Sequence, residues 1–116
     1  MIIELRSKES NLISKASSKR DLLIQKSLIE QRLEEARRCL VSWSLEASVR
    51  QQECLSYLRR IQELWYSGEW NESHFNKLES RTREAFHNKG TYMGMVEVLE
   101  RELEKIKTEI GCKEIM

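Results

Sequence analysis

The stretch from Ile3 to Tyr66 contains neither glycine nor proline, and this constrains the fold more than any other feature of the chain. These two residue types most often end a helix, so nothing in the stretch obliges a helix to stop. Evidence for strands is almost absent, because β-branched residues never form an alternating run. The sequence therefore predicts one continuous helix over about residues 3–66, which would extend roughly 96 Å.

Apolar residues in this stretch recur at alternating steps of three and four. They occupy two heptad positions, Leu22, Ile29, Ala36 and Trp43 at one, and Leu33, Leu40, Ala47, Cys54 and Ile61 at the other. Side chains at this spacing form one stripe along a helix, which is the contact seam of a coiled coil. We expect no charged residue in the centre of this seam.

The segment at residues 67–71 is the best break in the chain. Gly68 can adopt the positive φ that ends a helix, and Asn71 is a good N-cap for the next one. Trp70 and Phe75 have the spacing of a hydrophobic staple around that cap. The sequence therefore predicts a turn here.

A second helix is expected over about residues 72–110. Its stripe again steps by three or four residues, through Phe75, Leu78, Thr82, Ala85, Lys89, Tyr92, Val96, Leu99, Leu103, Ile106 and Ile110. Gly90 and Gly94 are expected to soften or briefly break this helix. The alternative is an outward notch of small residues at which a partner docks. Gly111 is expected to end the helix.

These elements predict an all-α fold, in which residues 1–116 form one elongated antiparallel two-helix coiled-coil hairpin with unequal arms. The second arm pairs back only to about residue 28, so residues 1–27 are expected to be an overhang without a partner. Basic residues outnumber acidic ones in this overhang. Four lysines fall where the projected seam needs apolar side chains: Lys8, Lys15, Lys19 and Lys26. A shifted apolar stripe runs beside them through Leu5, Leu12, Ala16 and Leu23.

The candidate site is a protein-binding surface of two parts. The first is the basic and apolar overhang, represented by Leu5, Lys8, Leu12, Lys15, Lys19, Leu23 and Lys26. The second lies at the turn, where Trp65 and Trp70 suit a binding tip because aromatic residues are common hot spots. The alternative for these aromatics is a plug that closes the end of the coiled coil.

Other function classes find little support. The 20 basic and 19 acidic residues nearly balance, so no overall field favours nucleic acid. His74 and His87 are too far apart for one helical metal site and are expected to be solvated, so we expect no enzyme, metal or cofactor. Three cysteines without CxxC spacing suit a reducing compartment. Short apolar runs and a charged start predict a cytoplasmic protein without membrane insertion or a signal peptide.

The chain resembles the FliJ/YscO (SctO) family of stalk proteins in flagellar and virulence type III secretion systems. The resemblance lies in the opening Leu5-Arg6-Ser7-Lys8-Glu9, the continuous arm to Tyr66 and the seam closing at Leu103-Glu104-Lys105-Ile106. It implies a rod that enters the pore of a hexameric export ATPase and contacts the export gate, in the cytoplasm or peripherally at the inner membrane. A small helical export chaperone and a coiled-coil subunit of an unrelated scaffold are the alternatives.

Overall fold

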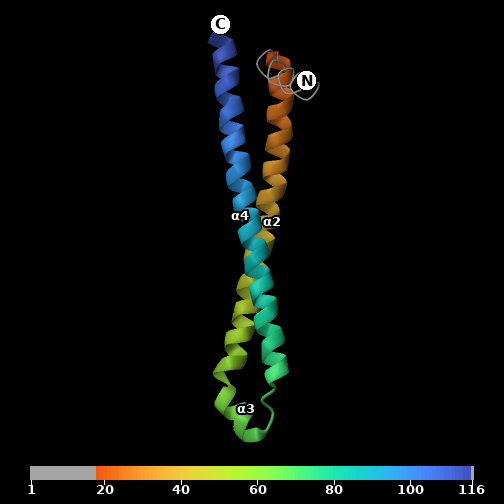
Figure 1. Cartoon of the computed structure of the whole chain (residues 1–116), viewed down its shortest axis with the longest axis vertical. Coiled ribbons are helices and arrows are strands. Elements are labelled where there is room, and N and C mark those ends of the chain that lie inside the picture. The colour runs from red at the N-terminus through yellow and green to blue at the C-terminus, as the bar shows by residue number, and fades with distance from the viewer. Residues whose placement is uncertain (1–17, 116) are drawn as a thin grey trace, which may run out of the picture. The chain divides into compact units, whose positions relative to one another are not determined.

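A computed structural model describes residues 18–115, which form three helices and no strand. Helix α2 spans Lys19–Arg59, α3 spans Ile61–Ser67 and α4 spans Glu72–Ile115 (Figure 1). The predicted all-α fold is confirmed for this part of the chain. No helix within it has an apolar stretch long enough to cross a membrane.

The chain divides into two compact units, and both long helices contribute to each. The central unit comprises residues 34–97. The terminal unit comprises residues 1–33 and 98–116, of which 18–33 and 98–115 are described.

Contacts between α2 and α4 follow a consistent order within the central unit. The rings of Tyr57 and His74 meet edge-on with their centroids 4.9 Å apart. The hydroxyl of Thr82 donates a hydrogen bond of 3.2 Å to the backbone carbonyl of Arg50. Of these two contacts, the one with the higher residue number on α4 has the lower residue number on α2. The buried apolar residues of this unit are Ala36, Ala47, Leu64, Leu78 and Ala85.

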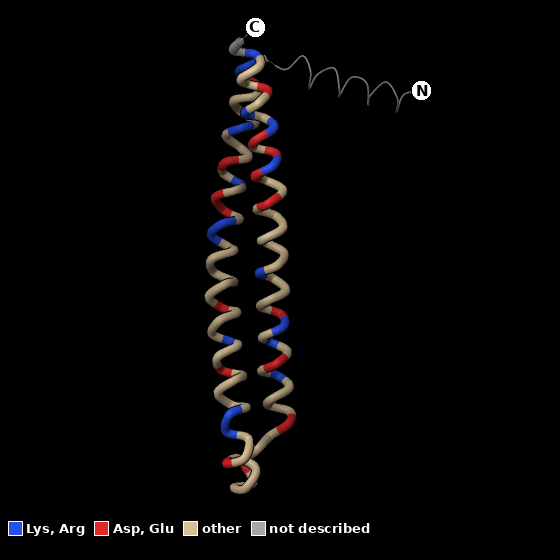
Figure 2. The backbone as a smooth tube through the Cα atoms, turned by 90° about the vertical axis from the view of Figure 1, so that its left-hand side faces the viewer, with Lys and Arg blue, Asp and Glu red and all other residues tan. Residues whose placement is uncertain are grey.

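In the terminal unit the described parts of α2 and α4 lie side by side in both views (Figures 1 and 2). Four residues form its buried apolar core: Leu22, Leu33, Leu99 and Ile110. All four belong to the stripes expected from the sequence. The three-four repeat therefore predicts the core of this unit as well.

Burial confirms most of the predicted seam. Every member of the α4 stripe from Phe75 to Ile110 is buried or half-buried, including Thr82 and Lys89. On α2 the same holds for the predicted positions from Leu22 to Cys54. The predicted seam residue Ile61 is exposed. It lies beyond the end of α2.

The first arm is not one continuous helix. α2 ends at Arg59, and Arg60 forms a turn in which its N–H donates to the carbonyl of Tyr57 at 3.1 Å. That bond spans three residues instead of the four of an α-helix, so the chain tightens before α3 begins. After this turn Leu64 is the buried residue of α3 and Ile61 is exposed. The predicted stretch 3–17 lies outside the described residues.

The predicted turn has the caps expected of it. Gly68 has a φ of 73°, which is the left-handed conformation that favours glycine. The side-chain oxygen of Asn71 accepts a 3.0 Å hydrogen bond from the N–H of His74, as an N-cap does. The rings of Trp70 and Phe75 lie 5.5 Å apart, which confirms the staple.

The second helix is longer and more regular than predicted. α4 runs through Gly90, Gly94 and Gly111 to Ile115, so the expected softening or break and the expected end at Gly111 are wrong. None of these glycines has a positive φ. A helical glycine costs about 1 kcal/mol relative to alanine. Stripe residues packed on both sides of Gly90 and Gly94, and Ile110 before Gly111, offset a cost of that size.

The expected overhang is also wrong where it can be observed. Leu22 is only 2% exposed, and the described start of α2 lies beside the extended end of α4 (Figure 1). The prediction failed because it paired the two arms directly at the turn, whereas α3 lies between them and Tyr57 of α2 meets His74 of α4. Residues 1–17 of the expected overhang lie outside the described residues.

Candidate functional site

An aromatic cluster occupies one end of the central unit, where α4 begins. It consists of Tyr57, Trp70, His74 and Phe75. Trp70 stacks on Tyr57 with ring centroids 4.8 Å apart and an interplanar angle of 21°. The Tyr57 hydroxyl accepts the N–H of Asn71 at 3.0 Å, and the Trp70 indole N–H donates to Glu72 at 3.0 Å. Trp70 is therefore held in the fold, as expected of a plug.

Two aromatic side chains beside this cluster face solvent instead. Trp65 is 68% exposed and Tyr66 is 90% exposed. We call these two residues the exposed aromatic pair. Aromatic side chains such as these are enriched at protein–protein hot spots. They make this end of the central unit the candidate binding surface.

The short helix α3 fixes the exposed aromatic pair in place. Leu64 is 4% exposed and anchors the helix, and its carbonyl accepts the N–H groups of Glu69 and Trp70 at 2.8 and 3.0 Å. The Ser67 hydroxyl donates to the same carbonyl at 3.1 Å. Because three donors converge on one buried residue, the backbone that carries Trp65 and Tyr66 is preorganised for binding.

The two aromatic residues predicted as a site share this end of the fold but have different environments. Trp65 is available to a partner, whereas Trp70 is half-buried between Tyr57 and Phe75. Sequence spacing could not separate these cases. After the turn at Arg60, α3 buries Leu64 and leaves its neighbour Trp65 exposed.

The residues predicted at the basic segment are only partly described. Leu5, Lys8, Leu12 and Lys15 lie outside the described residues. Lys19 and Leu23 are exposed. Lys26 is half-buried at a seam position, and its ammonium lies 3.7 Å from the carboxylate of Glu30. It is therefore a paired cation in the fold rather than a free one.

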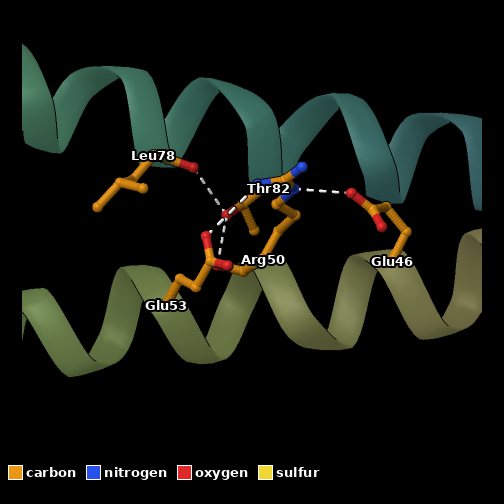
Figure 3. Close-up of polar contacts among 5 residues, drawn as sticks. All are labelled: Glu46, Arg50, Glu53, Leu78 and Thr82. Carbon is orange, nitrogen blue, oxygen red and sulfur yellow. Dashed lines mark hydrogen bonds and ion pairs between the residues drawn. The ribbon is translucent and has the colours of Figure 1, made fainter.

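A charged residue interrupts the α2 seam, contrary to expectation. Arg50 lies seven residues after Trp43, so continuing the repeat by one step would have found it. Its guanidinium is 2.7 Å from Glu46 and 3.5 Å from Glu53, and this arrangement is drawn in Figure 3. The hydrogen bond that the Arg50 guanidinium donates to Glu46 is the largest cause that raises the pKa of Arg50, so the side chain stays charged. Its charge is neutralised on its own helix.

Thr82 faces Arg50 from α4 and completes a polar layer in the seam. Its hydroxyl contacts the carbonyl of Arg50 and also that of Leu78, which lies 2.8 Å away (Figure 3). No buried side-chain N or O lacks a partner among the described residues. The layer is thus a satisfied structural feature. Polar groups at seam positions can fix the register of paired helices.

Replacing Arg50 by leucine is expected to leave the free energy of unfolding unchanged or to raise it by ~1 kcal/mol. An apolar residue would continue the seam, while the ion pairs lost are partly exposed and contribute little. Urea denaturation followed by circular dichroism measures the change. A loss above ~2 kcal/mol would show that the pairs of Arg50 stabilise the fold more than surface pairs do.

The groups that could support other chemistry are dispersed. The described residues contain no group of three or more His, Cys, Asp or Glu that could hold a metal ion. His74 and His87 are both exposed, as expected. Cys39 and Cys54 are half-buried and Cys112 is exposed, and all three are free thiols. Cys39 is the main cause that raises the pKa of Tyr92 across the seam.

Comparison with protein-family models, curated proteins and solved structures gives no match. The described residues supply a geometry that bears on function. That geometry is a helix pair with a polar layer in its seam and the exposed aromatic pair at one end.

Proposed function

We propose that this chain is a non-enzymatic coiled-coil stalk component of a type III secretion export apparatus, and that it engages the export ATPase and the export gate. The proposal combines the resemblance to the FliJ/YscO (SctO) family with two long helices that share a three-four seam. A stalk needs a stable helical shaft and a surface that its partners recognise. The observation that carries the proposal is the exposure of Trp65 and Tyr66.

The shaft is proposed to be an antiparallel two-helix coiled-coil hairpin that turns at Gly68. The order of contacts in the central unit supports this, since Tyr57 meets His74 and Arg50 meets Thr82. In the terminal unit Leu22, Leu33, Leu99 and Ile110 are all buried, as expected if this register sets Leu22 beside Ile110 and Leu33 beside Leu99. In the cell the hairpin would lie in the cytoplasm or peripherally at the inner membrane.

Two separate surfaces are proposed to bind partners: the exposed aromatic pair on α3, and the basic segment at the start of α2. The case for the basic segment is weaker than expected because Leu22 is buried and Lys26 is paired with Glu30. The aromatic end keeps its support, since Trp65 and Tyr66 contribute a large contact area on a fixed backbone.

The test measures binding of the purified chain to the export ATPase and to the cytosolic domain of the export-gate protein from the same organism. Combining Trp65→Ala with Tyr66→Ala is expected to weaken binding at least ~10-fold, as loss of two hot-spot residues does. Phe86→Ala, which removes an exposed aromatic residue from α4, is the matched control and should change affinity less than ~2-fold. Absence of binding to both partners would refute the proposal.

A second variant tests the basic segment as a binding surface of its own. Charge reversal at Lys15 and Lys19 should weaken ATPase binding and reduce its dependence on salt if the basic segment takes part. If only the aromatic variant loses binding, the partner contacts the turn alone.

An export chaperone is the second candidate, and the outer side of α2 favours it. Leu45 is 64% exposed and Val49 lies one turn further along the same side. A chaperone would hold the apolar face of a partner helix on such a surface. Recovery of an export substrate in place of the ATPase, lost with Leu45→Glu and retained with Trp65→Ala, would support this function. A scaffold subunit would bind neither class.

A further inference from the structure

We propose that a groove between α2 and α4 in the central unit binds an acidic amphipathic helix of a protein partner. The groove has a volume of about 860 Å³ and is open to solvent, so it is far larger than a site for a single ion. Its lining includes Arg50, Arg60 and Arg81 together with Val49, Tyr57 and Leu78. We call it the arginine groove. The proposal goes beyond the stalk function and does not depend on it.

Positive charge predominates in the lining of the arginine groove. Glu53 is the one acidic side chain among the lining residues. Arg50 is neutralised, because its guanidinium lies 2.7 Å from Glu46 and 3.5 Å from Glu53 (Figure 3). The other two arginines therefore decide which charge the groove offers to a partner.

Arg60 and Arg81 are both available to a partner. Arg81 is exposed and makes no ion pair or side-chain hydrogen bond within residues 18–115. Arg60 lies 3.6 Å from Glu63, but the two side chains are 56% and 71% exposed, and such surface pairs contribute little. A carboxylate of the partner can therefore pair with either guanidinium without breaking a stable contact, and arginine–carboxylate pairs are among the stronger polar contacts.

The neighbouring groove in the central unit has a different balance of charge. It is lined by Trp43, Glu46, Arg50, Arg81, Glu84 and Ala85. The two arginines that it shares with the arginine groove are matched there by two glutamates. An acidic segment is therefore favoured in the stretch that runs from Arg81 toward Arg60, and not in the neighbouring groove.

The two available arginines stand at opposite ends of the arginine groove. Arg81 precedes Thr82, whose hydroxyl contacts the carbonyl of Arg50. From Arg50 to Arg60 the chain extends about 15 Å, which is close to three turns of a helix. A partner helix lying in the groove would therefore carry carboxylates about three turns apart on one side, with apolar residues between them.

Apolar contacts and backbone chemistry select a helix as the occupant. Val49 is 52% exposed, and Tyr57 and Leu78 add apolar surface beside it. Both walls of the groove are helices whose backbone groups are already hydrogen-bonded, so an extended peptide would find no backbone partners there. A helix satisfies its own backbone and can pack against two others, as in a bundle. Nucleic acid fits less well, since Glu53 lies in the groove and repels phosphate.

A synthetic peptide is the probe for this groove. It has about 18 residues, with a leucine stripe at three-four spacing and glutamate on both sides of the stripe. A second peptide has lysine at every glutamate position and isolates the effect of charge. Fluorescence anisotropy of each labelled peptide measures its affinity for the purified full chain. The glutamate peptide is expected to bind at least ~10-fold more tightly than the lysine peptide.

Charge reversal at Arg81 is compared with charge reversal at Arg83. Both arginines are exposed on α4, but Arg83 pairs with Glu79 at 3.3 Å and does not line the arginine groove. Arg81→Glu should weaken binding of the glutamate peptide at least ~10-fold and strengthen binding of the lysine peptide. Arg83→Glu should change both affinities less than ~2-fold. Circular dichroism checks that helicity is retained, and Arg81→Ala and Arg83→Ala replace the two variants if it is not.

Four results would overturn the proposal. They are no binding of the glutamate peptide at ~100 µM chain, equal affinity for the two peptides, equal effects of the two charge reversals, and preferential binding of a single-stranded oligonucleotide that Arg81→Glu abolishes. The last result would assign the groove to nucleic acid. Because the peptides contain no segment of an export ATPase, these outcomes are independent of whether the chain is a stalk.

Discussion

Leu99→Asp is expected to lower the free energy of unfolding by ~3–5 kcal/mol, because it removes a buried leucine and places a carboxylate in the apolar core of the terminal unit. Leu99 is 9% exposed, and no polar group of the core is free to accept the new charge. Urea denaturation monitored by circular dichroism at 222 nm, a probe of helix, measures the loss.

Val98→Asp is the matched control, since Val98 precedes Leu99 on the same helix but is 50% exposed. It should change stability by less than ~1 kcal/mol. If both variants lost the same free energy of unfolding, Leu99 would not be a seam residue. The loss would then come from placing aspartate in a helix and not from burying its charge.

Trp70→Ala is expected to destabilise the protein by ~2–3 kcal/mol, whereas Trp65→Ala should change stability by less than ~0.5 kcal/mol. Trp70 stacks on Tyr57 and packs against Phe75, so its removal leaves both rings without a partner. Trp65 is largely in solvent and contributes little to the folded core. Thermal and urea denaturation of the two variants measure the difference.

At a temperature where both variants are folded, Trp65→Ala should weaken partner binding more than Trp70→Ala does. Trp65→Ala removes a contact surface, while Trp70→Ala leaves the exposed aromatic pair in place. If Trp70→Ala alone abolishes binding in the folded protein, the plug is itself the binding residue and the assignment of Trp65 is wrong.

Much of the fold could be predicted because periodicity and caps are local signals. The step from Leu22 to Ile29 and Ala36 sets the buried side of α2. Gly68 and Asn71 act through their own backbone and side-chain chemistry, so their positions were predictable. The end of α4 was not predictable from the sequence. Packing of residues such as Ile110 stabilises the helix by more than the low helix propensity of Gly111 destabilises it.

The site was harder to predict because it depends on a local change of direction. The turn at Arg60 has no glycine, proline or side-chain cap to mark it. Leu64 is buried, as the repeat through Leu22 and Trp43 predicts, whereas Ile61 is exposed after the turn, which the repeat does not predict. Arg50 is a different case, since the repeat itself identifies its position and its acidic neighbours explain how the charge is tolerated there.

The proposed antiparallel pairing of the two long helices can be tested by a single distance within the terminal unit. Spin labels at Ile24→Cys and Thr108→Cys, both exposed, are introduced after the native cysteines are replaced by alanine. Pulsed electron paramagnetic resonance should give a distance of roughly 20–40 Å, since packed helix axes lie about 10 Å apart. Dilution with unlabelled chain must leave this distance unchanged. A helical chain that did not fold back would place the labels roughly 120 Å apart and give no resolved distance, which would contradict the account.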